Sequence, residues 1–547
     1  MIYWLLFIVF AVTSINCANL HVEIEKIFQL SVIHFNDFHA RFDQINHSGG
    51  VCKAGENCIG GFSRLYRQIE DILTDKPSSI LLNAGDSFQG TLWYTVGKWN
   101  VTQQFMNRLP IDAEVLGNHD FDDGISGVVP YIKSLHHPVV VCNIDDELEP
   151  EIQRIYQKSI VIEREGKKIG VIGVILSECD KIAKTGQLKF LLESPSVNAE
   201  AERLVKEEGV YTNIVLSHSG YDIDKKIAAN ASEKISLIVG GHSHTFLFTG
   251  DDPPGPDIVG GPYPTVVKSK YGHTVLVTQA SALCKYLGNI TIFFYENGEV
   301  IDYSGQPIFL SSNHQQDEQI NQELSLWKNT VESQGDVVLG STFVTLSGES
   351  CYNRECSLGN FVADAMVYAY TSDIGGGPWT RSSIAVVNPG GMRNDIRIGD
   401  ITYNDLATAQ PFENTFDIGE IEGVHLRELF EYTSLPYRYK NAENRLNILQ
   451  VSGLKIIYKL KKPEGQRLES LKVLCQNCSV PVYEDLDDNK TYSIVVISHL
   501  LDGGRYPILT NKVKNRTTGR LDMDVLIEFL AHRDPVFIET GTRLTFN

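Results

Sequence analysis

Short apolar runs alternate with amphipathic stretches along the first half of the chain, from residue 27 to about residue 311. Residues 29–35 form one apolar run, and residues 61–73 repeat their apolar side chains at helical spacing, with Ser63 as a candidate N-cap. Strands that are buried on both faces typically appear as continuous apolar runs, and helices between them indicate layered packing. The pattern predicts an α/β domain over residues 27–311.

Five of these apolar runs end in side chains that can bind metal ions. The polar residues that follow the runs are Asp37, His39, Asp86, Asn118, His119, Asp122, His218, His242 and His244. Each short motif alone is weak evidence, because Gly, Asn and Asp are also common in solvated turns. Open sheets, however, bind ligands at the carboxyl ends of their strands, so five such ends predict one two-metal site.

The residue types in this set indicate the chemistry of the site. Carboxylates, an amide and imidazoles without cysteine suit a catalytic pair of divalent cations, roughly 3.5–4 Å apart. We expect Asp86 to bridge the two ions. The other expected ligands are Asp37, His39 and His244 for one ion, and Asn118, His218 and His242 for the other. A water held between the ions would lose a proton and attack a phosphorus atom in line.

His119 neighbours an expected ligand but is assigned a different role. We expect its ring to face the scissile phosphate, where an imidazolium would stabilise the transition state or protonate the leaving oxygen. Asp122 follows three residues later and is expected to hold the tautomer of His119. We interpret Asp120 and Asp123 as turn carboxylates, and His34, which lies inside an apolar run, as a core histidine.

The second half of the chain begins with a polar, helix-forming stretch, residues 312–335. Its expected apolar stripe contains Ile320, Leu324, Leu326 and Trp327. We interpret this stretch as a linker helix; the alternative is the first helix of a second, mixed domain over residues 336–547. In that domain an apolar strand, residues 384–387, runs into a Gly-rich turn from Asn388 to Arg393. The turn could present backbone N–H groups to an anion, or it could be a plain tight turn.

The N-terminus is expected to direct export of the protein. Residues 1–18 combine an apolar run with small and polar residues, which predicts a signal peptide; the alternative is a buried strand. No later stretch is apolar enough to span a bilayer, and no hydrophobic C-terminal tail signals a lipid anchor. Seven glycosylation sequons agree with export: Asn46, Asn100, Asn230, Asn289, Asn477, Asn489 and Asn515.

Three pairs of cysteines lie close together in the sequence. The pairs Cys52/Cys58, Cys351/Cys356 and Cys475/Cys478 are expected to form local disulfides in an exported chain. The last pair could also be half of a zinc site, but no second Cys-x-x-Cys accompanies it. Cys142, Cys179 and Cys284 are left over, besides Cys17 in the signal segment.

The formal net charge of −20 argues against a nucleic-acid polymer or an anionic membrane as the main partner. A small phosphate substrate remains compatible with this charge, because bound divalent cations create a local positive site on an acidic protein.

The motifs resemble those of the 5′-nucleotidase/apyrase family. The matching segments are residues 37–39, 85–90, 117–122, 217–220, 241–244, 286–288, 351–364, 388–393 and 411–412. The resemblance implies an α/β (α+β overall) fold. A four-layered, calcineurin-like metallophosphoesterase domain would be joined by a helix to a mixed α/β nucleotide-binding domain, whose swing carries substrate to the metals. Zinc is the expected metal, with magnesium, calcium and manganese as alternatives.

The resemblance also implies a nucleotide site in the second domain. The expected substrate-binding residues are Arg354, Asn388, Arg393, Phe412, His499 and Arg505. Two positions depart from the family pattern: Tyr352 stands where an arginine is common, and Arg505 replaces an aspartate that would bind ribose. Asp502 is a candidate substitute for that aspartate. We therefore expect loosened nucleoside recognition and a preference for longer phosphate chains.

Without an anchor signal, the chain is similar to the secreted salivary apyrases of blood-feeding arthropods. That similarity implies an extracellular enzyme that hydrolyses ATP and ADP, to AMP, and so opposes platelet activation. One alternative is a 5′-nucleotidase that converts AMP to adenosine. A second alternative is a binding protein with weak or no catalysis, which would sequester nucleotide or block a host haemostatic protein.

Overall fold

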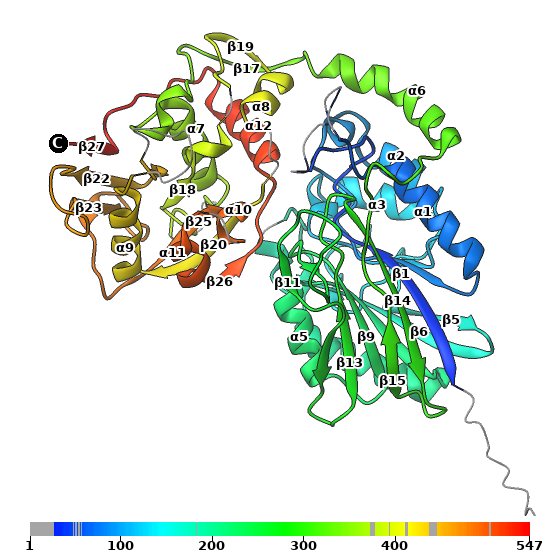
Figure 1. The fold of residues 1–547 in the computed structure, drawn as a ribbon. Coiled ribbons are helices and arrows are strands. Elements are labelled where there is room, and N and C mark those ends of the chain that lie inside the picture. The colour runs from blue at the N-terminus through cyan, green and yellow to red at the C-terminus, as the bar shows by residue number, and fades with distance from the viewer. Residues whose placement is uncertain are drawn as a thin grey trace, which may run out of the picture.

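The computed structural model describes residues 27–547 except residues 48, 50, 51, 53, 54, 56, 182, 372–377, 393, 411–413, 437–445, 503 and 504. The predicted signal peptide, residues 1–18, lies outside the described residues. Figure 1 shows two lobes, one built from the blue to green part of the chain and one from the green to red part. Among the described helices, none combines the length and apolar character needed to cross a membrane.

Two six-stranded sheets form the centre of the N-terminal lobe. The first has the order β15-β14-β1-β2-β3, with β16 beside β14, and β1, β2 and β3 are parallel. Its strands are β1 (Phe28–Phe35), β2 (Ile80–Asn83), β3 (Ala113–Glu114), β14 (Tyr286–Phe294), β15 (Val300–Ser304) and β16 (Ile308–Phe309). The second has the order β12-β13-β9-β8-β6-β5. Its strands are β5 (Ser159–Arg164), β6 (Lys167–Ile175), β8 (Thr212–His218), β9 (Ile235–Gly240), β12 (Thr265–Lys268) and β13 (Thr274–Thr278).

The two sheets pack face to face, and helices cover their outer faces. Val32 of β1 and Leu216 of β8 share one buried core between the sheets. Their chain neighbours point outward, so that Ile33 and Val215 pack with helices. These helices are α1 (Phe62–Asp75), α2 (Leu92–Met106) and α3 (Ile125–Ser134) on the first sheet, and α4 (Glu193–Arg203) and α5 (Tyr221–Asn230) on the second. Burial of both strand faces explains the continuous apolar runs, and the predicted four-layered α/β arrangement is confirmed.

The C-terminal lobe is a mixed α/β unit around one large core. Its central sheet has the order β21-β18-β25-β20-β26, and a second sheet has the order β24-β23-β22-β27. The strands are β18 (Ala385–Val387), β20 (Phe416–Glu422), β21 (Gln450–Ser452), β22 (Leu454–Tyr458), β23 (Leu468–Leu474), β24 (Tyr483–Asp485), β25 (Thr491–Ile497), β26 (Lys514–Thr517) and β27 (Leu544–Phe546), with a separate pair, β17 (Val338–Thr342) and β19 (Gly399–Thr402). The helices are α7 (Ser357–Tyr368), α8 (Tyr403–Ala409), α9 (Gly423–Thr433), α10 (Ser498–Leu501), α11 (Pro507–Lys512) and α12 (Asp522–Arg533).

Helix α6 (Glu318–Gln334) connects the two lobes (Figure 1). Its buried side chains, Ile320, Leu324 and Val331, join the core that α1 and α2 form on the first sheet. Trp327 adds a polar contact, because its Nε1 donates to Gln104 Oε1 of α2 at 3.0 Å. The connecting helix therefore packs as part of the N-terminal lobe.

Two predicted helix details are wrong. Ser63 does not cap α1, because the helix begins at Phe62; the Ser63 hydroxyl instead donates to the Asp317 carbonyl at 2.8 Å. Leu326 is not part of the apolar stripe of α6, since 78% of its surface is exposed. Two residues along a helix turn the side chain by about 200°, so Leu326 faces away from the side on which Leu324 packs.

All three predicted disulfides are present. They join Cys52 to Cys58, Cys351 to Cys356 and Cys475 to Cys478. Cys142, Cys179 and Cys284 are buried free thiols.

The packing of α6 generates a prediction for two leucines that are two residues apart. Leu324→Ala should lower the free energy of unfolding by about 2–5 kcal/mol, because it leaves a cavity in the core. Leu326→Ala is the matched control and should change it by less than about 0.5 kcal/mol. Urea unfolding followed by tryptophan fluorescence measures both values, and equal effects of the two substitutions would contradict this packing.

Candidate active site

The seven predicted metal ligands come together where five strands of the N-terminal lobe end. The described residues contain two groups whose ligand atoms lie within 4.8 Å of one another: Asp37, His39 and His244 form one, and Asp86, His218 and His242 form the other. Asn118 joins the second group, since its Oδ1 lies 2.8 Å from His242 Nδ1. His218 is the last residue of β8, and the loops after β1, β2, β3 and β9 supply the other side chains.

Asp86 lies between the two groups. Its Oδ2 is 3.0 Å from His218 Nε2 in its own group and 3.9 Å from His39 Nε2 in the other. Asp37 Oδ1 also approaches both groups, at 3.3 Å from His244 Nε2 and 3.9 Å from His218 Nε2. A carboxylate in the position of Asp86 can contact two neighbouring cations at once.

Two histidines of the site, His39 and His218, direct their Nε2 atoms toward this space. His39 Nδ1 donates to the Phe88 carbonyl at 3.1 Å, and His218 Nδ1 donates to the Ala84 carbonyl at 2.6 Å. A carbonyl only accepts, so Nδ1 carries a proton in both rings and Nε2 is the nitrogen left to bind a metal ion. His218 Nε2 is buried, and its nearest polar neighbour is Asp86 Oδ2 at 3.0 Å, in a geometry too poorly aligned for a regular hydrogen bond. This donor set fits divalent cations.

The backbone at these ligands adopts an uncommon conformation. Asp37, His39, Asp86, His242 and His244 all have positive φ angles, between 47° and 74°. Non-glycine residues rarely adopt such angles, and those that do cluster at functional sites. Left-handed turns directly after the strands direct the ligand side chains toward one another.

His119 and Asp122 form a buried pair beside the ligand groups. His119 Nδ1 lies 2.7 Å from Asp122 Oδ2, and the rings of His119 and His39 have centroids 5.2 Å apart. Burial alone would lower the pKa of His119, but the carboxylates of Asp122 and Asp86 outweigh it and raise that pKa to about 10. At neutral pH the pair is therefore an imidazolium beside a carboxylate.

Charged residues of the C-terminal lobe lie close to this pair. Asp524 of α12 interacts electrostatically with Asp122 and His119, and burial together with Asp122 raises the pKa of Asp524 to about 6. Arg520, just before α12, interacts with Asp122 in the same way. Both lobes therefore contribute to the electrostatic environment of the His119–Asp122 pair.

Two supporting residues were not predicted as part of the site. Gln279 is fully buried, donates to the Gly241 carbonyl at 2.7 Å and accepts from the Ser243 hydroxyl at 3.0 Å, so it supports the loop that carries His242 and His244. It directly follows β13, so the strand-end pattern that located the ligands could have located it. Asp120, interpreted above as a turn carboxylate, is fully buried and accepts backbone N–H groups of both neighbouring ligand loops.

The predicted nucleotide residues that the structure describes lie in the C-terminal lobe. Asn388 follows β18 and His499 follows β25, and these two strands are parallel neighbours, so both residues reach the same sheet edge. The carboxamide Oδ1 of Asn388 is buried without a hydrogen-bond partner. Arg393 and Phe412 lie outside the described residues.

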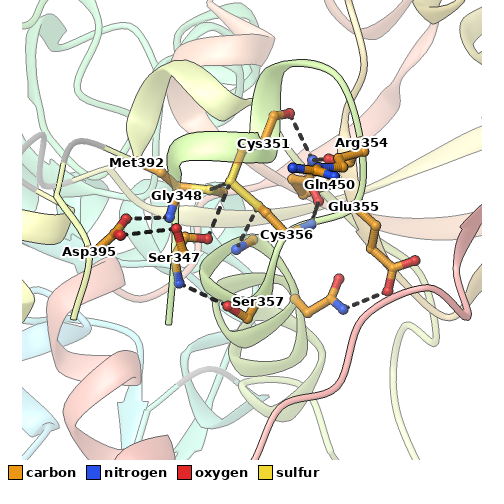
Figure 2. The surroundings of a disulfide bond; sticks show 12 residues. Ser347, Gly348, Cys351, Arg354, Glu355, Cys356, Ser357, Met392, Asp395 and Gln450 are labelled. Atoms are coloured by element: carbon orange, nitrogen blue, oxygen red, sulfur yellow. Dashed lines mark hydrogen bonds between the residues drawn. A yellow bond between two sulfur atoms is a disulfide. The ribbon is translucent and has the colours of Figure 1, made fainter. Parts of the chain in front are cut away.

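Arg354 lies in the short loop closed by the Cys351–Cys356 disulfide (Figure 2). Gln450 supports this loop, because its Nε2 donates to the carbonyls of Cys351 and Arg354, each at 2.9 Å. The side chain of Arg354 is exposed. The loop thus has a rigid base and an arginine that is accessible to solvent.

Asp502, the candidate substitute for the missing ribose carboxylate, is already paired. It accepts a hydrogen bond from Arg516, whose Nε also donates to the buried Asp417 at 2.7 Å. Arg505 is exposed, and its carbonyl accepts from the Tyr432 hydroxyl at 3.2 Å. In this conformation Arg516 competes with any sugar hydroxyl for the Asp502 carboxylate.

Known families match both lobes. Residues 30–246 match the calcineurin-like phosphoesterase family, and residues 337–511 match the 5′-nucleotidase C-terminal domain family. An apyrase from Tabanus yao is 45% identical over 94% of this chain and 93% of its own length. An apyrase from Aedes aegypti is 38% identical over 93% and 90%, and a 5′-nucleotidase from Rattus norvegicus is 34% identical over 95% and 91%.

Solved structures agree with the fold across both lobes. The 5′-nucleotidase precursor from Thermus thermophilus has a TM-score of 0.60 at 29% identity, over 95% of this chain and 99% of that one. The NAD nucleotidase of Haemophilus influenzae has a TM-score of 0.78 over the same shares. At 22% identity, this second likeness shows the fold alone.

The geometry of the His119–Asp122 pair generates a prediction about catalysis. His119→Ala should lower kcat for phosphate release by roughly 10²–10⁴-fold, because it removes a positioned acid, and should leave the metal content unchanged. Asp122→Asn should cause a smaller loss, since the imidazole remains. Steady-state kinetics and elemental analysis of the purified variants measure both quantities. Loss of a metal equivalent in His119→Ala would instead make His119 a ligand.

Proposed function

Because the chain belongs to the 5′-nucleotidase/apyrase family and is a metal-dependent phosphohydrolase, we propose that it is an apyrase that releases phosphate from ATP and ADP. This proposal rests mainly on one observation: two neighbouring groups of candidate metal ligands, each with carboxylate and imidazole side chains, lie at the strand ends of the N-terminal lobe. The similarity to the Tabanus and Aedes apyrases supports nucleoside tri- and diphosphates as substrates, with AMP as the end product.

The two groups of ligands would hold two divalent cations. Asp37, His39 and His244 would bind one, Asn118, His218 and His242 the other, and Asp86 both. When bound, such ions polarise phosphoryl oxygens and lower the pKa of a coordinated water. We propose zinc as the metal, since four of the seven side chains are imidazoles and zinc accepts imidazole together with carboxylate.

The chain's own residues would supply the remaining chemistry. Because His119 Nδ1 is bonded to Asp122, the proton available to a leaving oxygen is the one on Nε2. Asp122 fixes the orientation of the ring and favours its charged form. An imidazolium at this position would neutralise the negative charge that develops on the leaving oxygen as its bond to phosphorus breaks.

The C-terminal lobe would bind the nucleoside. The proposed contacts are Arg354, Asn388, Arg393, Phe412, His499 and Arg505. The pairing of Asp502 with Arg516 supports weak recognition of the ribose, and the exposed Arg505 adds positive charge that would favour a longer phosphate chain. This combination agrees better with an apyrase than with an enzyme that recognises the nucleoside of AMP.

We further propose that the protein acts outside the cell and opposes platelet activation by removing ATP and ADP. The disulfides and the sequons support an oxidising compartment. A 5′-nucleotidase acting on AMP is the second candidate, which the similarity to the Rattus enzyme favours. A nucleotide-binding protein, or one that also blocks a host haemostatic protein, is the third candidate.

The substrate preference can be tested directly. The chain from about Asn19 should release phosphate from ATP and ADP in the presence of zinc, with AMP accumulating, because recognition of the nucleoside is weak. Chelation should abolish release, and zinc, magnesium, calcium and manganese should then be compared for recovery. Dominant AMP cleavage would indicate a 5′-nucleotidase. Absence of release from all three nucleotides, with His119→Ala unchanged, would indicate a binding protein.

Residue 505 provides a test of specificity. Arg505→Asp should raise kcat/KM for AMP relative to ATP, because it adds a carboxylate for the ribose and removes a cation from the phosphate chain. Arg505→Ala is the matched control, which removes the cation without adding the acceptor. Rates for both nucleotides at equal ionic strength give the ratio. An unchanged ratio in Arg505→Asp would refute this role for Arg505.

A further inference from the structure

Asp120 connects the two central loops of the site through hydrogen bonds to their backbones. We propose that it is a positioning residue, which fixes the loops of Asp86 and Asn118 at the spacing that metal binding requires. This inference rests on the proposed metal centre. It assigns a function to a side chain that does not itself belong to either group of metal ligands.

The carboxylate of Asp120 is fully buried and accepts four backbone N–H groups. Oδ1 accepts from Ser87 at 3.0 Å and Phe88 at 3.2 Å, and Oδ2 accepts from Gly117 at 2.8 Å and Asp86 at 3.2 Å. Three of these donors belong to the loop after β2 and one to the loop after β3. One carboxylate therefore joins the segments that carry the bridging ligand and the amide ligand.

The loops after β2 and β3 lie so close together that their backbones have little room to move. His119 N donates to Asp86 Oδ1 at 2.8 Å, and a Cβ added to Gly117 would lie 2.0 Å from that same oxygen. Asp86 itself has a φ of 57°, in the left-handed region that few non-glycine residues occupy, although aspartate tolerates it better than most. The hydrogen bond from Asp86 N to Asp120 Oδ2 fixes the peptide of Asp86 in this conformation.

Only a carboxylate satisfies this arrangement. All four partners are donors, and an ionised carboxylate has two oxygens that only accept. An asparagine would offer one acceptor oxygen and would direct its NH₂ group against two backbone N–H groups. Asp120→Asn therefore keeps the shape of the side chain while removing two of the hydrogen bonds and adding repulsion between donors.

Asp123 provides a matched control in the same turn. Its carboxylate accepts from the Tyr94 hydroxyl at 2.7 Å and from Lys98 Nζ at 3.2 Å, and neither partner belongs to the ligand loops. Asp123→Asn makes the same change from a carboxyl to an amide group, three residues away, without changing the bonds between the loops. A difference between the two variants therefore reports on the hydrogen bonds that connect the loops, and not on the loss of an acidic group from this turn.

The test is metal binding by the full chain, measured with Mn²⁺ and with Zn²⁺ against a competing chelator. Asp120→Asn should bind each ion about 10- to 100-fold more weakly than the wild type, as expected when a group that orients ligands is lost. Asp123→Asn should remain within about twofold of the wild type. Excess Mn²⁺ should restore occupancy, since the ligands themselves are intact. Wild-type affinity in Asp120→Asn overturns the inference, whereas a wild type that binds no metal overturns the proposed function instead.

If Asp120→Asn does not fold, hydrogen exchange of the wild type tests the same inference. After chelation, peptides that contain the amides of Asp86, Ser87, Phe88 and Gly117 should keep their slow exchange, because Asp120 and not the metal fixes these loops. Exchange of these amides that rises at least tenfold on chelation would show that the metal orders the loops, and would overturn the inference.

Discussion

The site brings charged and polar side chains together at the ends of five strands, where they would repel one another or remain unpaired. The surrounding backbone holds them in these positions. Two carboxylates and four imidazoles lie within two groups of a few ångströms each. Carbonyl groups bind the outer nitrogens of His39 and His218, and left-handed turns direct the ligands inward. The sheets, buried on both faces, supply the rigid base that such strained turns require.

Much of this arrangement could be predicted from the sequence, because its determinants are local. Continuous apolar runs locate doubly buried strands, and polar motifs directly after them locate the site. The contributions of Asp120 and Leu326 could not be predicted in the same way. Whether the carboxylate of Asp120 faces solvent or backbone N–H groups depends on a loop more than thirty residues away in the sequence. Whether Leu324 or Leu326 is the buried leucine of α6 depends on where α2 lies. Residue types alone contain neither fact, and helical spacing shows only that Leu324 and Leu326 lie on opposite sides of the helix.

The two lobes place their proposed functional residues by the same geometric rule. Parallel neighbours β18 and β25 bring Asn388 and His499 to one edge of the C-terminal sheet, as β1, β2 and β3 bring acids and imidazoles to an edge of the first. Helix α6 packs into the N-terminal core, so the C-terminal lobe begins only after this helix ends. Arg520 and Asp524 nevertheless lie near His119 and Asp122. Any movement of one lobe relative to the other would therefore change the field at the proposed acid.

The net negative charge of the protein affects how an anionic nucleotide can reach the site. A protein with a formal charge of −20 repels a polyanionic nucleotide at long range, so attraction has to be generated locally. In the C-terminal lobe, the cation Arg516 is neutralised by Asp417 and Asp502, whereas Arg354 and Arg505 are exposed. In the N-terminal lobe, the negative charges of Asp37 and Asp86 would repel a phosphate group. Bound cations would make the local electrostatic potential positive. Metal occupancy would then determine whether the phosphate chain can approach the site, as well as whether it is cleaved there.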